Sequence, residues 1–252
     1  MAKKPRQLRL FDPNKLSSRE MPAVGGLTDA SRRYAESRGL SWSEPTARFN
    51  PRRAHATYLA YRDAQRQGGE TPGIRESYAV MREHIGKQFD FLTKPEAEGG
   101  LGFSVEFTEH DPYPSAAAMA EDVANKRIKA MKTSSTGGHT YFTNEENDMF
   151  RAVHDVFGHA ALGRNFSREG EEAAYLSHRQ MFPPEAHAAV TSELRGQNAF
   201  LNYGPERDFP DQSPGTPLVG LPDWASSTKD FDKSGPRAPK PKQPKYEQGR
   251  LF

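Results

Sequence analysis

With 252 residues, the chain is long enough for one sizeable domain but short for two. It contains no cysteine, which excludes disulfides and thiolate metal ligands, so any metal must be held by histidine and carboxylate side chains. No apolar run reaches the length of a membrane span, and the opening residues MAKKPRQLRLF lack the apolar stretch of a signal peptide. We therefore expect a soluble, cytoplasmic protein.

Charge is unevenly distributed along the chain. Residues 1–20 and residues 225–252 each carry a net charge of +4 and the whole chain carries +2, so the part between them carries −6. Basic ends on an acidic body suggest contact with nucleic acid or another polyanion, although solubility explains short Lys/Arg tails equally well. Composition predicts a flexible N-terminal region over 1–45, a helical domain over 46–205 and a Pro/Lys-rich tail over 206–252.

Hydrophobic spacing in the first half of the chain predicts helices and one strand. A short helix is expected over 29–38, within the otherwise flexible N-terminal region, and a second over 55–67. The strongest amphipathic pattern covers 74–92, where apolar residues recur at intervals of four, three, four and four. Paired glycines follow, and alternation of apolar and polar residues over 103–107 predicts a half-buried strand.

The second half is predicted to be mostly helical. Ser115 is the expected N-cap of a helix that runs to Ala130, and Asn144 is the expected N-cap of the next one. Two further helices are expected over 168–180 and 184–202. The predicted fold class is therefore mainly α with one or two short strands, as a single helical domain with flexible basic tails.

The stretch FRAVHDVFGHAALG contains two histidines, His154 and His159, five residues apart. His154 falls on the apolar stripe of this segment, but a regular helix would turn His159 away from it by about 140°. Gly158 readily leaves helical geometry, so we expect the helix to end there and His159 to fold back toward His154. The spacing also argues against the H-E-x-x-H pair of zinc proteases. The alternative is a structural core His154 with a surface His159.

The segment HDVFGHAALGRNFSREGEE, followed by AAVTSELRG, resembles the iron-binding segment of the pterin-dependent aromatic amino acid hydroxylases. In that family an H-E-L-L-G-H motif supplies two ligands, an F-S-x-E stretch follows, and a later V-E-F-G helix supplies the third. The resemblance implies His154 and His159 as histidine ligands and Glu193 as the carboxylate. It also places Phe166, Ser167 and Glu169 in the F-S-x-E stretch. It covers about fifty residues and differs in having Asp155 for Glu and a shorter gap before Glu193.

The resemblance leaves the organic co-reductant and the substrate unassigned, because the pterin and amino-acid pockets of the family are not recognisable upstream. The chain as a whole also looks like proteins of actinobacterial phages. That second resemblance implies the cytoplasm of a host cell as the location and adds no activity.

Helical spacing supports Glu193 independently, because it lies on a stripe of small residues expected to face inward. A buried carboxylate needs a partner, which a metal ion or an arginine such as Arg151 or Arg195 can supply. The preceding helix offers rival ligands, and a carboxylate-bridged two-iron site built with them is an alternative: Glu171, Glu172 and His178.

Two histidines and one carboxylate on one face of a metal are the arrangement used for non-haem Fe(II) oxygen chemistry. We therefore expect an Fe(II)-dependent oxygenase or hydroxylase, with DNA or nucleotides as the substrate class that the basic ends suggest. Asp155 is expected to orient a ligand or a bound water, unless it is a helix-surface acid. The same ligands around Zn²⁺ would form a hydrolase site. A non-catalytic, clamp- or nucleic-acid-associated factor with a structural histidine cluster is the other alternative.

The two ends of the chain carry similar short motifs. RQLRLF at 6–11 resembles the Q-L-x-L-F peptide by which bacterial replication and repair proteins dock on the sliding clamp, and the matching residues are Gln7, Leu8, Leu10 and Phe11. The last residues, QGRLF, repeat Gln248, Leu251 and Phe252 in the same frame without the first leucine. A short extended motif can bind a hydrophobic groove, so we expect a sliding clamp as partner, although five-residue patterns also arise by chance.

Overall fold

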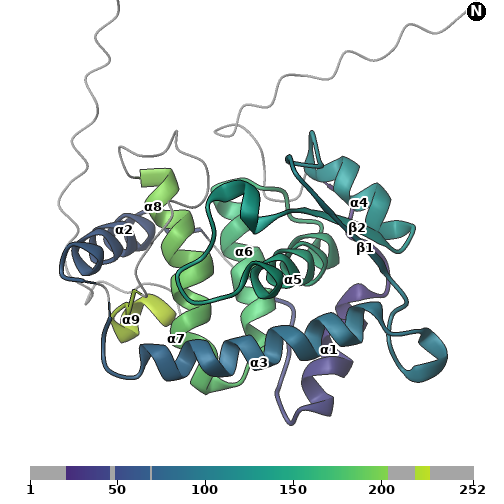
Figure 1. Ribbon diagram of the computed structural model, residues 1–252, viewed down its shortest axis with the longest axis horizontal. Helices are drawn as coiled ribbons and strands as arrows, with labels where there is room; N and C mark the ends of the chain where they lie inside the picture. The colour runs from purple at the N-terminus through teal and green to yellow at the C-terminus, as the bar shows by residue number, and fades with distance from the viewer. Residues whose placement is uncertain (1–20, 46–48, 69, 204–218, 228–252) are drawn as a thin grey trace, which may run out of the picture.

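The computed structural model describes residues 21–45, 49–68, 70–203 and 219–227. Helices dominate this part of the chain, as the sequence predicts, and the strands are short. The helices are α1 (Leu27–Ser37), α2 (Pro51–Arg66), α3 (Ile74–Thr93), α4 (Ala116–Ala124), α5 (Asn144–His154), α6 (Arg168–His178), α7 (His187–Val190), α8 (Gln197–Tyr203) and α9 (Asp223–Ser226). The strands are β1 (Ser104–Thr108) and β2 (Arg127–Met131). Helix α2 and the strand pair lie at opposite ends of the molecule (Figure 1).

Helix α3 is the long helix that the four-three-four-four spacing predicts. Its apolar stripe is fully buried at Tyr78, Met81 and Ile85, and the helix packs against both α5 and α7. Burial of three such side chains supplies roughly 1.5–3 kcal/mol each, which makes α3 a central support of the core. Figure 1 shows it running along one side of the molecule.

The strands form a parallel pair in which Ser104 is opposite Arg127. The connection contains α4, which ends at Ala124, so the expectation of one helix reaching Ala130 was wrong. Lys126 has a left-handed φ of 54° that stops helical propagation. After it, buried residues alternate with more exposed ones over β2, a period of two that fits a strand.

The core extends beyond the helical domain predicted for 46–205. Met21, Leu27 and Tyr34, from the region expected to be mostly flexible, are 4%, 5% and 2% exposed. Helix α1 therefore belongs to the folded body, close to the short helix expected at 29–38. Val219 and Ala225, from the predicted tail, are also fully buried.

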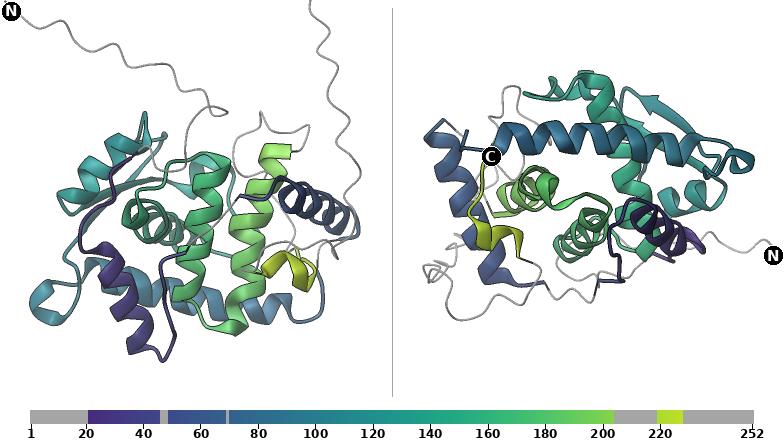
Figure 2. Two further views of the ribbon diagram at one scale, coloured as in Figure 1. Left: turned by 180° about the vertical axis from the view of Figure 1, so that it is seen from behind. Right: turned by 90° about the horizontal axis from the view of Figure 1, so that it is seen from below.

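Two helices of the core depart from α-helical geometry at their ends. A π-helical segment, Asp155–His159, follows α5 directly, and a second one, Thr191–Gly196, lies between α7 and α8. The predicted helix at 184–202 is thus an almost continuous helical stretch of mixed type. Figure 2 shows α6 lying beside the α7–α8 stretch, with which it is in contact.

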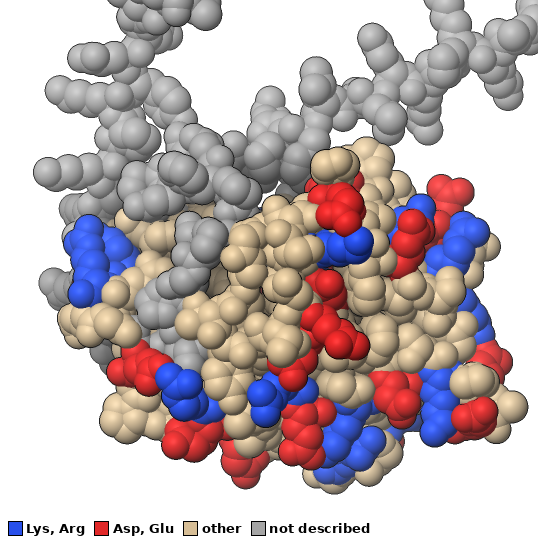
Figure 3. All heavy atoms as spheres, in the orientation of Figure 1, with Lys and Arg blue, Asp and Glu red and all other residues tan. Residues whose placement is uncertain are grey.

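The described residues include no membrane span, and one face of the molecule carries charges of both signs. No helix within the described ranges is long and apolar enough to cross a membrane. On the face shown in Figure 3, Lys and Arg side chains alternate with Asp and Glu. The basic ends noted in the sequence lie largely outside the described residues.

Candidate metal centre

The first π-helical segment explains the five-residue spacing of the histidines. In this segment the N–H of Ala160 donates to the carbonyl of Asp155, five residues earlier. Such a turn holds one residue more than an α-helical turn, so residues five apart lie roughly one above the other. The rings of His154 and His159 are accordingly 4.9 Å apart, centre to centre. The expectation that the helix ends at Gly158 was wrong: the backbone stays helical and widens instead.

Gly158 has a different role from the predicted one. A Cβ atom at this position would lie 3.0 Å from both Cε1 and Nδ1 of His154, and 3.2 Å from Cβ of Ala174. These distances are tighter than ordinary van der Waals contacts. Glycine is therefore required because the His154 ring and α6 both press against the backbone of this turn.

Helix α6 supplies the third member of the cluster. Potential ligand atoms of His154, His159 and Glu171, one from each residue, all lie within 4.8 Å of one another. One carboxylate oxygen of Glu171 is 3.8 Å from Nε2 of His154 and 3.4 Å from Nε2 of His159. Glu171, Ala174 and His178 are at i, i+3 and i+7, so α6 turns one face toward the histidines. We call His154, His159 and Glu171 the ligand cluster.

The hydrogen bond behind His159 fixes the tautomer of its neutral ring. Nδ1 lies 3.1 Å from the backbone carbonyl of Arg164, which can only accept, so Nδ1 carries the proton. In the neutral ring Nε2 then carries a lone pair, and this atom lies 3.4 Å from a carboxylate oxygen of Glu171. A backbone carbonyl behind a histidine in this way is a usual support for a metal ligand.

The charges of the cluster are strongly coupled. Burial favours the neutral form of Glu171, but the adjacent His159 and His154 rings hold the pKa of its carboxyl well below the usual range. Burial lowers the pKa of His154. Burial acts the same way on His159, yet the neighbouring Glu171 carboxylate leaves its pKa raised. The ionised carboxylate of Glu171 therefore lies beside the two imidazole rings, where it stabilises a positive charge in the cluster.

Asp155 lines the same cavity as the ligand cluster. Burial, reinforced by the negative charge of Glu171, raises the pKa of its carboxyl to about 7, while His159 acts in the opposite direction. Within the described part of the chain it makes no hydrogen bond to either histidine. Its expected role in orienting a ligand remains a prediction.

Glu193, the carboxylate that the family resemblance implies, lies in the second π-helical segment and is 7% exposed. It faces the cavity that the ligand cluster also lines, but its carboxylate is held by other groups. Tyr78 and Gln197 donate to it, and Nε2 of His139 is 3.2 Å away. The structure thus brings Glu171, rather than Glu193, against the two histidines.

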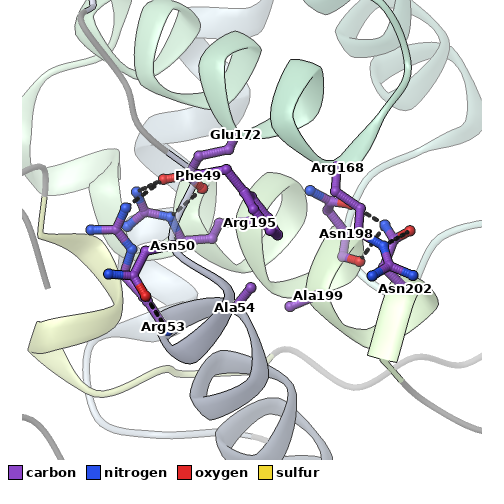
Figure 4. Close-up of a pocket in the computed structure, with 10 residues that line it drawn as sticks. All are labelled: Phe49, Asn50, Arg53, Ala54, Arg168, Glu172, Arg195, Asn198, Ala199 and Asn202. Atoms are coloured by element: carbon purple, nitrogen blue, oxygen red, sulfur yellow. Dashed lines mark hydrogen bonds and ion pairs between the residues drawn. The ribbon is translucent and has the colours of Figure 1, made fainter. Parts of the chain in front are cut away.

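Glu172, one of the rival ligands, is engaged elsewhere. Figure 4 shows its carboxylate between two arginines, with bonds of 2.9 Å from Arg53 and of 3.0 and 2.5 Å from Arg195. All three residues are buried, and Arg195 also donates to the carbonyls of Ala225 and Ser227. The adjoining pocket of about 10 Å³ has room for about one water. This arginine–glutamate triad is structural and ties α2 and the α9 segment to α6.

His178, the remaining rival, is fully buried and uses both ring nitrogens within the protein. Its Nδ1 lies 3.2 Å from Nδ1 of His154, and its Nε2 lies 2.6 Å from Oε1 of Gln88. Burial holds the pKa of His178 well below its ordinary value. It contacts a member of the ligand cluster but does not itself face the cavity.

The cavity in front of the ligand cluster has a volume of about 490 Å³, which is in the range of small-molecule sites. Its wall includes Tyr113 and Phe150, polar side chains such as Asn147, and Phe166 at the opening. Phe166 is 39% exposed, the one large apolar side chain so exposed within the described ranges, and its ring packs edge-on against His159. The arrangement can hold a cation at one wall and admit a ligand beside it.

Sequence reasoning missed His139 and Tyr78, which hold Glu193 in place. His139 lies in a Gly-rich turn, where its Nδ1 accepts from the backbone N–H groups of Tyr141 and Phe142. Tyr78 was recognised only as part of the apolar stripe of α3. A tyrosine on such a stripe has a hydroxyl that needs a buried partner, which was the one signal in the sequence.

Comparisons with protein-family models, with curated proteins and with solved structures find no match for this chain. The resemblance to the aromatic amino acid hydroxylases therefore depends on the quoted residues alone. The clamp motif at Gln7, Leu8, Leu10 and Phe11, and its C-terminal counterpart at Gln248, Leu251 and Phe252, lie outside the described residues.

Proposed function

We propose that this protein is a non-haem Fe(II)-dependent oxygenase in which His154, His159 and Glu171 hold the metal. The observation that carries the proposal is the convergence of two imidazole Nε2 atoms and one ionised carboxylate at the wall of an open cavity. A set of two histidines and one carboxylate suits Fe(II), which when bound supplies the capacity to activate O₂.

The protein's own residues bind and orient. The carbonyl of Arg164 holds the proton of the neutral His159 ring on Nδ1, which leaves Nε2 as the nitrogen that can bind a metal, and the low pKa of Glu171 keeps its carboxylate charged at neutral pH. Phe166 gives the cavity an apolar edge beside the cluster, and the side chain of Glu193 also lines it. The basic ends of the chain favour DNA or nucleotides as the substrate class.

Metal analysis of anaerobically purified protein tests the proposal. We expect close to one iron per chain in the wild type, and loss of iron in His154→Ala, His159→Ala and Glu171→Gln. Glu169→Gln is the matched control, because Glu169 is exposed on the same helix. A wild type that holds no metal, and that added Fe(II) does not stabilise in the absence of oxygen, would refute the proposal.

The same experiment decides between the two carboxylates. If Glu193→Gln empties the site while Glu171→Gln stays loaded, the ligand is Glu193, as the family resemblance implies, and the cluster must rearrange on binding. If zinc is retained instead of iron, a hydrolase becomes the better assignment. Oxygen uptake by the Fe(II)-loaded protein with nucleotides or DNA then tests the reaction class.

A further inference from the structure

A chain of hydrogen bonds runs from His154 into the core, away from the cavity. It passes through His178 to Gln88 on α3 and ends at the backbone carbonyl of Met181. All three residues behind His154 are 0% exposed. The direction of each bond can be assigned from its fixed end, because a backbone carbonyl can only accept.

Gln88 is oriented by that carbonyl. Its side-chain atom 3.2 Å from the oxygen of Met181 must be the NH₂ group, which leaves Oε1 facing His178. An amide oxygen only accepts, so Nε2 of His178, 2.6 Å away, must carry a proton. The opposite orientation of the Gln88 amide is excluded, because it would place Oε1 against the carbonyl oxygen of Met181, and both atoms are acceptors.

His178 in turn determines the tautomer of His154. The two Nδ1 atoms are 3.2 Å apart, so one donates and the other accepts. Phe150 and Phe182 flank the His178 ring. No carboxylate among the described residues contacts the ring. A second proton on His178 would therefore be a buried charge without a counter-ion. His178 is therefore neutral and accepts at Nδ1, which makes His154 the donor at Nδ1.

We infer that His178, held by Gln88, is a positioning residue that keeps the proton of His154 on Nδ1 and so leaves Nε2 free to bind the metal. The inference rests on the proposed metal function. His159 obtains the same tautomer from a backbone carbonyl, whereas His154 depends on side chains. Partners of this kind behind a ligand typically contribute 10–100-fold to metal affinity.

Titration of the metal-free, full-length protein with Fe(II) under anaerobic conditions tests this. We expect His178→Leu, which removes the acceptor, to weaken Fe(II) binding about 10–100-fold. His178→Gln should retain affinity within a few-fold, because an amide again offers one acceptor and one donor. Gln88→Met should weaken binding as well, since it frees His178 to change tautomer. Ser77→Ala is the control: Ser77 also ties α3 to a neighbouring segment through a buried hydrogen bond, from the N–H of Ala189.

Nitrogen NMR of the imidazoles gives a second readout that needs no variant. In the metal-free wild type at neutral pH, His154 should show a protonated Nδ1 and a bare Nε2. Observation of the Nε2–H tautomer would overturn the inference, as would unchanged affinity in folded His178→Leu. A wild type with no affinity for Fe(II) would overturn the proposed function together with it. Normal wild-type binding with an unaffected His178→Leu overturns the positioning role alone.

Discussion

Replacing Gly158 by alanine tests the close packing around the histidines. The new Cβ would meet Cε1 and Nδ1 of His154 at 3.0 Å, so the ring must move by about 0.4 Å to reach an ordinary contact of 3.4 Å. The ring has little freedom, because Nδ1 is bonded to His178 and Cβ of Ala174 closes the other side at 3.2 Å. Overpacking of this kind costs about 1–3 kcal/mol.

Gly86, in the middle of α3, is the matched control. A Cβ there meets nothing within 4 Å, so Gly86→Ala should stabilise the protein by up to about 1 kcal/mol through helix propensity alone. Gly158→Ala should gain a similar stabilisation from helix propensity, but the cost of overpacking against His154 is subtracted from it. The two variants should therefore differ by about 1–3 kcal/mol in the free energy of unfolding.

Urea denaturation followed by circular dichroism measures that difference, and Fe(II) titration measures the effect on the site. We expect Gly158→Ala to bind metal more weakly and Gly86→Ala to bind it as the wild type does. Equal stabilisation by both substitutions, with metal affinity intact in both, would show that the His154 ring does not lie against this turn.

Three further predictions concern the rest of the fold. Glu172→Ala leaves two buried arginines without their carboxylate and should lower the free energy of unfolding by about 3–5 kcal/mol in urea denaturation. The N-cap of α5 is Thr143 rather than the expected Asn144, so Thr143→Ala should cost about 0.5–2 kcal/mol, with Fe(II) affinity unchanged when titrated. Burial, aided by Arg179, lowers the pKa of His187 from 6.5 to about 4, so the unfolded chain takes up this proton at higher pH than the folded chain. Stability should therefore fall as pH drops from 6.5 to 4, and His187→Gln should reduce the steepness of that fall in denaturation curves.

The regular parts of the fold were readable because local patterns determine them. The apolar spacing over 74–92 corresponds to α3, and the segment at 103–107 to β1, one residue displaced. The strand β2 was missed because an alanine-rich helix was expected to continue through it. The signal was present: Ile128 and Ala130 alternate with Arg127 and Lys129, a period of two.

The candidate site was only partly readable. The pairing of His154 with His159 was expected, but their five-residue spacing fits both a helix end at Gly158 and a π-helical turn, and the sequence did not distinguish the two. Glu171 and Glu172 are neighbours on one helix, about 100° apart around its axis. Which of them faces the histidines depends on how α6 is rotated against α5, and long-range packing determines that rotation.

The π-helical turns also let the chain hold one extra residue without rotating the helix that follows. Each turn accommodates one residue more than the α-helical turn it replaces, so a single-residue deletion between His154 and His159 would restore regular i→i+4 pairing. The two histidines would then be four residues apart and would still lie on one face of the helix. The same deletion in a regular α-helix would instead turn every later residue by about 100°. The second segment, which contains Glu193, should absorb a one-residue deletion in the same way.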